Sequence, residues 1–205
     1  DDTDKYFIFY ELMGKNYLSI GEVDSALDYF NKAIIEDSEN PFFYYYRAEC
    51  FFILEKYDES YLNINTVFDI IGSDDDFEKK SLWLYEKSLF LLGRSQFEVY
   101  NSSSRYTINT TNFDTLSVFN TLLKINKKAE YYFWAGKTVE NSLFLDKWGG
   151  FEIDGFAQEI SDGIDTTDYH EDWHELIGEL ILKNQYEAAA VFYGEAVKLD
   201  GKNIE

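Results

Sequence analysis

Two segments of this chain repeat each other at an interval of 34 residues, and this period constrains the fold more than any other feature. Aromatic and small residues recur at matched positions: Tyr10, Gly14, Tyr17, Ala26, Phe30 and Ala33 align with Tyr44, Ala48, Phe51, Ser60, Ile64 and Val67. A period of this length is typical of stacked helix-turn-helix units, each of which buries an apolar face against the next. The sequence therefore predicts an all-α solenoid built from antiparallel helix pairs.

The first of these segments resembles the tetratricopeptide repeat. The matching positions are Tyr10, Met13, Gly14, Tyr17, Gly21, Ala26, Phe30 and Ala33. Gly14 and Ala26 are small, as is needed where two helices approach closely. Gly21 can adopt the left-handed conformation that ends a helix. These features predict helices over 5–20 and 23–35.

A second unit follows Asn40-Pro41, because proline suits the first turn of a helix. We expect its helices over 41–54 and 57–71. A break at 72–76, acidic at its end, then favours a further helix, predicted over 77–92 and ended by Gly93. Polar loops are expected at 101–104 and 109–112, followed by helices over 113–125 and 129–147 in which Ala135-Gly136 forms another close helix contact.

The resemblance returns near the end of the chain, at Trp173, Leu176, Leu180, Tyr186, Ala189, Tyr193 and Ala196. Asn184 takes the turn position, and 186–200 is the expected last helix. We therefore predict one tetratricopeptide-repeat-like domain over 1–205. Its expected parts are repeats at 7–40 and 41–74, a degenerate region at 77–147, an irregular stretch at 148–167 and a last repeat at 168–201.

Composition and charge limit the classes of partner. Eighteen basic residues against thirty-nine acidic residues give a net charge of −21, so phosphate backbones and anionic membranes would be repelled. This charge either attracts a basic partner or keeps an aromatic-rich chain soluble. The apolar runs are far shorter than the ~20 residues that a membrane span needs, so no membrane insertion is expected.

The single cysteine, Cys50, predicts that the protein has no internal disulfide and favours a reducing, cytoplasmic compartment. The chain begins at Asp1 instead of methionine, so we expect that an upstream segment was removed. This segment could be a signal peptide, a tag or more of the same protein, which keeps a secreted or surface location open.

In tetratricopeptide-repeat proteins the first helix of each pair lines a concave groove, so the resemblance implies a peptide-binding groove here. The candidate residues lie between the core positions: Ile8, Glu11, Lys15 and Leu18, then Phe42, Tyr45, Glu49 and Phe52. Lys15 is the one cation among them, beside two glutamates and three aromatic residues. This composition favours an apolar or basic segment over the acidic tails that chaperone-binding members clamp. The alternative is that Phe42 and Phe52 pack against a neighbouring helix.

A different motif points to zinc chemistry. The segment His170-Glu171-Asp172-Trp173-His174 matches HExxH, in which two histidines on one helix face ligate zinc and Glu171 acts as the general base. It resembles the zinc-metallopeptidase helix, and Glu195 would be the third ligand. However, Trp173 also opens the last repeat, which places both histidines on exposed flanking faces. We favour this interpretation, in which no metal binds.

The sequence thus predicts a non-catalytic scaffold that binds a protein or peptide and needs no cofactor. The first alternative is a zinc-dependent hydrolase that uses the HExxH helix. The second is a carbohydrate-binding or surface-assembly component, indicated by the many aromatic residues and polar loops. Because no polar cap follows the last helix, Val191, Phe192 and Val197 should either pack against the irregular middle or form a homodimer.

Overall fold

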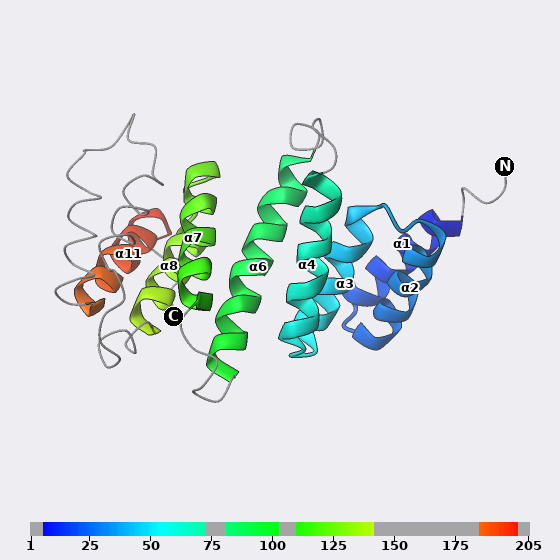
Figure 1. The fold of residues 1–205 in the computed structure, drawn as a ribbon, viewed down its shortest axis with the longest axis horizontal. Coiled ribbons are helices and arrows are strands. Elements are labelled where there is room, and N and C mark those ends of the chain that lie inside the picture. Colours follow the sequence, from blue (N-terminus) through cyan, green and yellow to red (C-terminus); the bar gives the residue numbers. More distant parts are fainter. Residues whose placement is uncertain (1–5, 73–80, 103–109, 142–184, 201–205) are drawn as a thin grey trace. The chain divides into compact units, whose positions relative to one another are not determined.

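The computed structural model describes residues 6–72, 81–102, 110–141 and 185–200, and each regular element in these ranges is an α-helix (Figure 1). The all-α prediction is therefore confirmed. The chain divides into two compact units, Asp1–Val99 and Tyr100–Glu205, and each is described by itself below. A single domain over 1–205 stays a prediction.

The first helix pair of unit 1 consists of α1 (Tyr6–Ser19) and α2 (Val23–Glu36). Gly21 has a φ of 82° in the turn between them. The Gly21 N–H donates to the Leu18 carbonyl at 3.1 Å, and the Glu22 N–H donates to the Tyr17 carbonyl at 2.9 Å. These two bonds satisfy carbonyls that the end of α1 leaves unpaired. The predicted turn at Gly21 is confirmed.

The second pair, α3 (Pro41–Ile53) and α4 (Tyr57–Gly72), repeats this geometry 34 residues later. Pro41 occupies the first turn of α3, and the Asn40 side chain accepts a hydrogen bond from the Phe42 N–H at 3.1 Å. In the α3–α4 turn the Glu55 N–H donates to Phe52 and the Lys56 N–H donates to Phe51. Glu55 has a φ of 58°, so a residue with a Cβ holds the left-handed position that Gly21 holds in the first pair.

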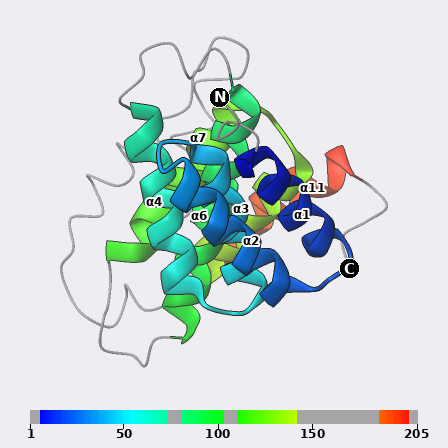
Figure 2. The same cartoon turned by 90° about the vertical axis from the view of Figure 1, so that its right-hand side faces the viewer.

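The core of unit 1 forms where α2 packs against both α1 and α3. Phe30, Ala26 and Cys50 are fully buried together. Gly14 makes the close approach of α1 possible, because a Cβ there would lie 2.6 Å from Cε1 of Phe30. Figure 2 looks onto the end of the unit that α1 and α2 form. The small residues of the 34-residue pattern therefore lie at helix contacts, as predicted.

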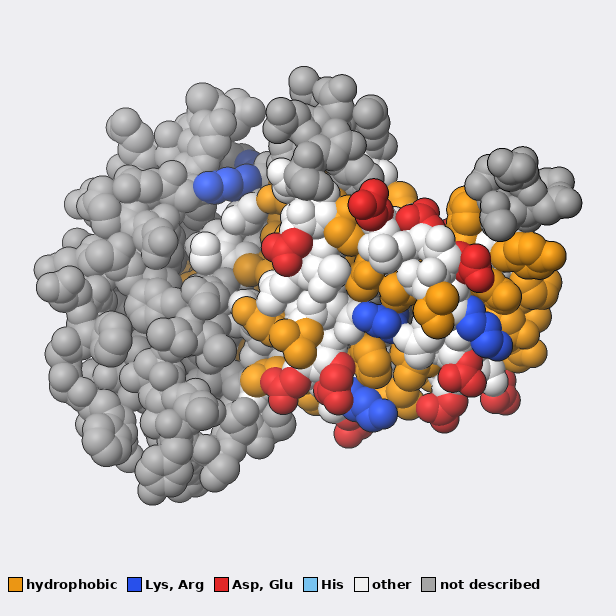
Figure 3. Space-filling view, turned by 45° about the vertical axis from the view of Figure 1, so that its right-hand side comes forward, with side chains coloured by type: hydrophobic (Ala, Val, Ile, Leu, Met, Phe, Trp, Pro, Cys, Tyr) orange, Lys and Arg blue, Asp and Glu red, His pale blue; other side chains and the backbone are white. Residues whose placement is uncertain are grey.

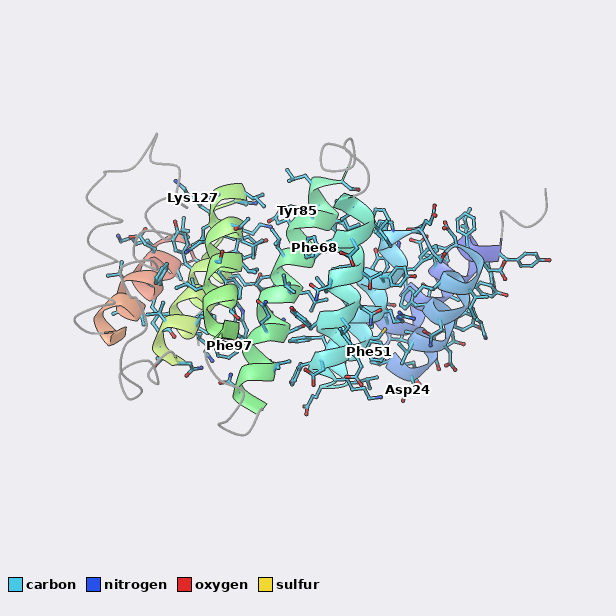
Figure 4. The ribbon with its side chains drawn as sticks, viewed as in Figure 1. Asp24, Phe51, Phe68, Tyr85, Phe97 and Lys127 are labelled. Carbon is cyan, nitrogen blue, oxygen red and sulfur yellow. The ribbon has the colours of Figure 1, made fainter. Side chains whose placement is uncertain are left out.

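Helix α6 (Leu82–Ser102) packs against the second pair. Ser60 and Ser95 lie with their Oγ atoms 2.9 Å apart, and the rings of Phe68 and Tyr85 meet edge to face across α4 and α6 (Figure 4). The prediction that Gly93 ends this helix is wrong. Gly93 is buried within it, and the helix continues to Ser102, so the predicted loop is also wrong at 101–102. Buried residues on both sides of Gly93 favour the helix over a turn, despite the low helix propensity of glycine. Residues 77–80 of the predicted helix lie outside the described residues.

Unit 2 contains α7 (Thr110–Ile125), α8 (Ala129–Asn141) and α11 (Gln185–Leu199). Helix α7 starts at Thr110, so the loop predicted at 109–112 is wrong from that residue on. Polar residues are common in a first helical turn, whose N–H groups lack partners within the helix. The predictions for 113–125 and 186–200 are confirmed, and the prediction for 129–147 is confirmed as far as Asn141; 142–147 lies outside the described residues.

The contact between α8 and α11 depends on Gly136. A Cβ on this residue would lie 2.8 Å from Cε1 of Tyr193 and 3.2 Å from Cβ of Phe192, which confirms the predicted close helix contact. The Tyr193 hydroxyl donates a hydrogen bond to Glu140 Oε2 at 2.6 Å. Phe192 is buried here, whereas Val197 is exposed, so Val197 remains accessible for the homodimer, which stays a prediction.

Candidate peptide-binding groove

The predicted groove residues lie on two neighbouring helices. Ile8, Glu11, Lys15 and Leu18 follow one another along α1, and Phe42, Tyr45, Glu49 and Phe52 follow one another along α3. The rings of Phe7 and Phe43 contact each other between these helices, with centroids 6.1 Å apart. The 34-residue period therefore brings two equivalent helix faces next to each other.

Helix α6 adds residues that the 34-residue period did not assign to this face. The Trp83 ring stacks on Phe42 with a centroid distance of 6.5 Å, and it meets Tyr45 edge to face at 5.8 Å. Trp83 itself remains half exposed. Helix α6 begins 41 residues after the start of α3 instead of 34, so the register slips before α6 and the period could not assign Trp83 to the groove. In the sequence, the feature that could have indicated Trp83 was its position shortly after the acidic break.

A carboxylate lies next to this aromatic cluster. The Tyr45 hydroxyl donates a hydrogen bond to Glu49 Oε1 at 2.7 Å, and the Tyr45 side chain is buried. Burial raises the pKa of Glu49 above its usual range, while the hydrogen bond from Tyr45 and the charge of Lys87 act in the opposite direction. Burial also raises the pKa of Tyr45, together with the neighbouring charge of Glu49. Tyr45 therefore stays a neutral donor.

The charges on α1 are largely satisfied within the protein. Lys15 pairs with Glu11 one turn earlier, and its ammonium lies 4.5 Å from the centroid of the Tyr46 ring. Burial by itself would lower the pKa of Lys15, but the interactions with Glu11 and Tyr46 raise it. A ligand carboxylate at this cation would compete with Glu11.

The remaining candidates divide between surface and packing contacts. Ile8 is exposed, whereas Leu18 packs against the core formed by Ala26, Phe30 and Cys50. Phe52 meets Tyr57 edge to face at 5.3 Å, and the Arg94 guanidinium lies 4.4 Å from its ring centroid. Phe42 and Phe52 thus contact a neighbouring helix, as the alternative interpretation predicted. Both remain partly exposed, and their role in binding stays a prediction.

The zinc motif lies outside the described residues at His170, Glu171 and His174. The third proposed ligand, Glu195, lies on α11 and forms an ion pair with Lys198 one turn later. Within the described ranges, no group of three or more histidine, cysteine, aspartate or glutamate side chains is arranged to hold a metal ion.

Two further properties concern the reactivity of Cys50 and the length of the apolar helices. Burial, together with the charge of Glu49, raises the pKa of the Cys50 thiol to about 12, so this thiol is protonated at neutral pH and a poor nucleophile. Among the helices that the structure describes, none combines the length and apolar character of a membrane span.

Known structures resemble this arrangement, although no family model and no curated protein matches the chain. MamA from Desulfovibrio magneticus RS-1 superimposes with a TM-score of 0.55 at 12% identity, over 98% of each chain. TTC0263, a tetratricopeptide-repeat protein of Thermus thermophilus, does so with 0.53 at 16% identity, over 96% of this chain and 93% of its own. The chain has the tetratricopeptide-repeat fold.

A third similar structure is YrrB, described as a tetratricopeptide-repeat protein with an unusual peptide-binding site. It superimposes with a TM-score of 0.53 at 15% identity, over 95% of this chain and 86% of its own. At these identities the likeness establishes the fold, which agrees with the prediction from the 34-residue period.

Proposed function

We propose that unit 1 is a non-catalytic scaffold whose α1–α3–α6 face binds an apolar segment of a partner protein that carries lysine or arginine. The observation that carries the proposal is the half-exposed Trp83, flanked by the rings of Phe42 and Tyr45 and lying on the same face as the carboxylate of Glu49. The peptide-binding site named for YrrB, which has the same fold, supports it.

The aromatic cluster explains the apolar part of the preference. An exposed indole face offers a large, rigid contact area, and aromatic anchors of this kind dominate the energy of many interfaces. A ligand ammonium or guanidinium over the same ring would add roughly 0.5–2 kcal/mol. Phe42 and Tyr45 hold Trp83 in place, so little side-chain entropy is lost on binding.

The charges explain why the segment should be basic. Glu49 lies in a partly desolvated position that raises its pKa, so a ligand cation nearby would stabilise its ionised form. An acidic segment would instead meet Glu49 and would find Lys15 already paired with Glu11. The net charge of −21 would in addition speed the approach of a basic partner.

Two fluorescently labelled peptides of about 12 residues test this proposal, one with leucine and lysine alternating with serine and one with glutamate in place of lysine. Anisotropy should report binding of the lysine peptide, weakened at high salt. Trp83→Ala should reduce its affinity about tenfold or more, whereas the control Ile35→Ala, at an exposed position on α2, should not. Equal affinity for both peptides, or no effect of Trp83→Ala, would exclude the proposed site.

A further inference from the structure

The outer face of α1 repeats a set of residues that the protein buries elsewhere. We define the α1 end face as Phe9, Leu12, Asn16 and Ile20. One period of 34 residues later stand Phe43, Tyr46, Cys50 and Leu54 on and after α3. The two sets therefore occupy equivalent positions in the first and second repeats.

In the set on α3, Tyr46 and Cys50 contact α2, and Phe43 meets Phe7 of α1. Phe43 is fully buried, and the Tyr46 ring stacks on Phe30 of α2 with centroids 5.4 Å apart. Cys50 is buried with Phe30 and Ala26 of the same helix. At these positions the first helix of one pair thus contacts the second helix of the preceding pair.

The equivalent residues of α1 are exposed to solvent. Phe9 is 51% exposed, Leu12 is 58% exposed and Ile20 is 71% exposed. Figure 3 shows hydrophobic side chains gathered over the end of the unit that α1 and α2 form. Asn16, at the position of the buried Cys50, is polar and exposed.

This face is separate from the proposed groove. Each of its first three residues lies one position after a groove residue of α1, because Phe9, Leu12 and Asn16 follow Ile8, Glu11 and Lys15. One residue along a helix corresponds to a rotation of about 100°. A ligand on the end face therefore does not occupy the groove.

The charges near this end indicate which helix would fit. Glu22, Asp24 and Asp28 are exposed on the turn and helix that follow α1. The exposed cation Lys32 of α2 lies over the Tyr29 ring that Phe9 meets edge to face. A second copy of the chain would bring equal acidic charge to the contact, since each copy carries −21. A helix with lysine or arginine beside its apolar stripe would meet attraction instead.

We propose that the α1 end face is a docking site for an amphipathic helix of a partner protein, with a basic polar face, which packs on α1 as α2 packs on α3. The apolar stripe of this helix covers Phe9 and Leu12. Its cations lie towards the acidic residues of the α1–α2 turn and of α2. The contact extends the repeat stack by one helix through an interface that the chain already uses internally.

The sequence of α2 supplies the probe. A labelled, end-capped peptide of residues 23–36 carrying Asp24→Lys, Asp28→Lys and Glu36→Lys keeps the stripe that covers α3 and makes its polar face basic. One control peptide keeps the acidic residues of α2, and a second adds Phe30→Gln to the basic peptide to break its stripe. We expect the basic peptide to bind the full chain in an anisotropy titration at least about tenfold more tightly than either control.

Variants of the chain locate the contact. The double variant Phe9→Gln, Leu12→Gln should weaken the basic peptide about tenfold or more, and Leu12→Gln by itself should weaken it in part. The matched control Ile35→Gln, Leu62→Gln changes exposed apolar residues elsewhere on the unit and should leave the affinity unchanged. Trp83→Ala should also leave it unchanged, which separates this site from the groove.

Three results would overturn the inference. The first is an affinity that the end-face variant does not alter while circular dichroism shows it folded. The second is equal binding of the acidic peptide, which would remove the assignment of a basic helix. The third is sedimentation that shows a dimer of the chain itself, lost in the Phe9→Gln, Leu12→Gln variant, because a second copy would then occupy the face.

Discussion

Gly14 lies where α1 contacts α2, and replacing it by alanine should displace the ring of Phe30. A Cβ at Gly14 would lie 2.6 Å from Cε1 and 2.7 Å from Cζ of Phe30, whereas carbon atoms in ordinary contact are about 3.5–4.0 Å apart. The ring must therefore move by about 1 Å. Overpacking of this kind costs ~1–3 kcal/mol, while the higher helix propensity of alanine than of glycine offsets about 1 kcal/mol of this. We expect Gly14→Ala to reduce the free energy of unfolding by about 1 kcal/mol.

The second repeat indicates how the clash can be relieved. Ala48 stands at the position of Gly14 there, and Ile64 stands at the position of Phe30; both are fully buried. Phe30→Ile by itself should destabilise the protein by roughly 1–3 kcal/mol, because it leaves part of the ring volume empty. In the double variant the new methyl group fills part of that space. The two changes should therefore cost about 1–2 kcal/mol less together than the sum of their separate costs.

Urea denaturation followed by far-UV circular dichroism on the parent chain, both single variants and the double variant measures this coupling. Gly194→Ala on α11 is the control, since a Cβ there would meet nothing within 4 Å in the described part of the chain. It should stabilise the protein by up to about 1 kcal/mol. Single effects that add to within about 0.5 kcal/mol would refute the argument that Phe30 is what the Gly14 position must accommodate.

Three further predictions concern backbone geometry and titration. Glu55→Gly should stabilise the chain by about 1 kcal/mol, and Gly21→Glu should destabilise it by about 1–2 kcal/mol, because both positions have positive φ. A shift of either urea midpoint in the opposite direction would contradict this. The folded-state pKa of Glu49 is raised above its unfolded value, so the stability it contributes is present below the unfolded pKa and is lost as pH rises through the folded pKa. Glu49→Gln should therefore lose less stability than the parent chain between acidic and neutral pH in the same assay, and parallel curves would argue against a raised pKa. Cys50, with a pKa of about 12, should react with a thiol reagent at about pH 8 only as fast as the chain unfolds, and rapid labelling of the folded protein would show that the thiol is accessible.

The first two helix pairs could be predicted almost to the residue because their boundaries depend on local chemistry. Gly21 and Asn40-Pro41 end and begin helices through interactions within a few residues. Gly93 misled the prediction because a glycine ends a helix only where the chain adopts the left-handed conformation there, and Gly93 stays helical. In α6 the residues around it are buried, and this depends on other helices.

The neighbouring placement of α1 and α3 was predictable for the same reason, whereas their role as a groove stays a prediction. The period assigned equivalent faces to α1 and α3, and these faces lie next to each other. Trp83 and Lys87 were missed because the register slips before α6, so no spacing connected them with Tyr45 and Glu49. The pairing of Lys15 with Glu11, which weakens the case for an acidic ligand, also needed side-chain positions.

The sequence by itself determined the helix pairs, their turns and the small residues at their contacts, because a 34-residue recurrence of apolar, aromatic and small side chains stabilises the same local unit each time. The tertiary structure decided that Glu55 adopts a left-handed conformation, that Glu49 is partly desolvated and that Phe9 is exposed while Phe43 is buried. Equivalent residues in two repeats share a pattern but not an environment. Burial depends on which helix lies opposite, and no local pattern encodes that neighbour.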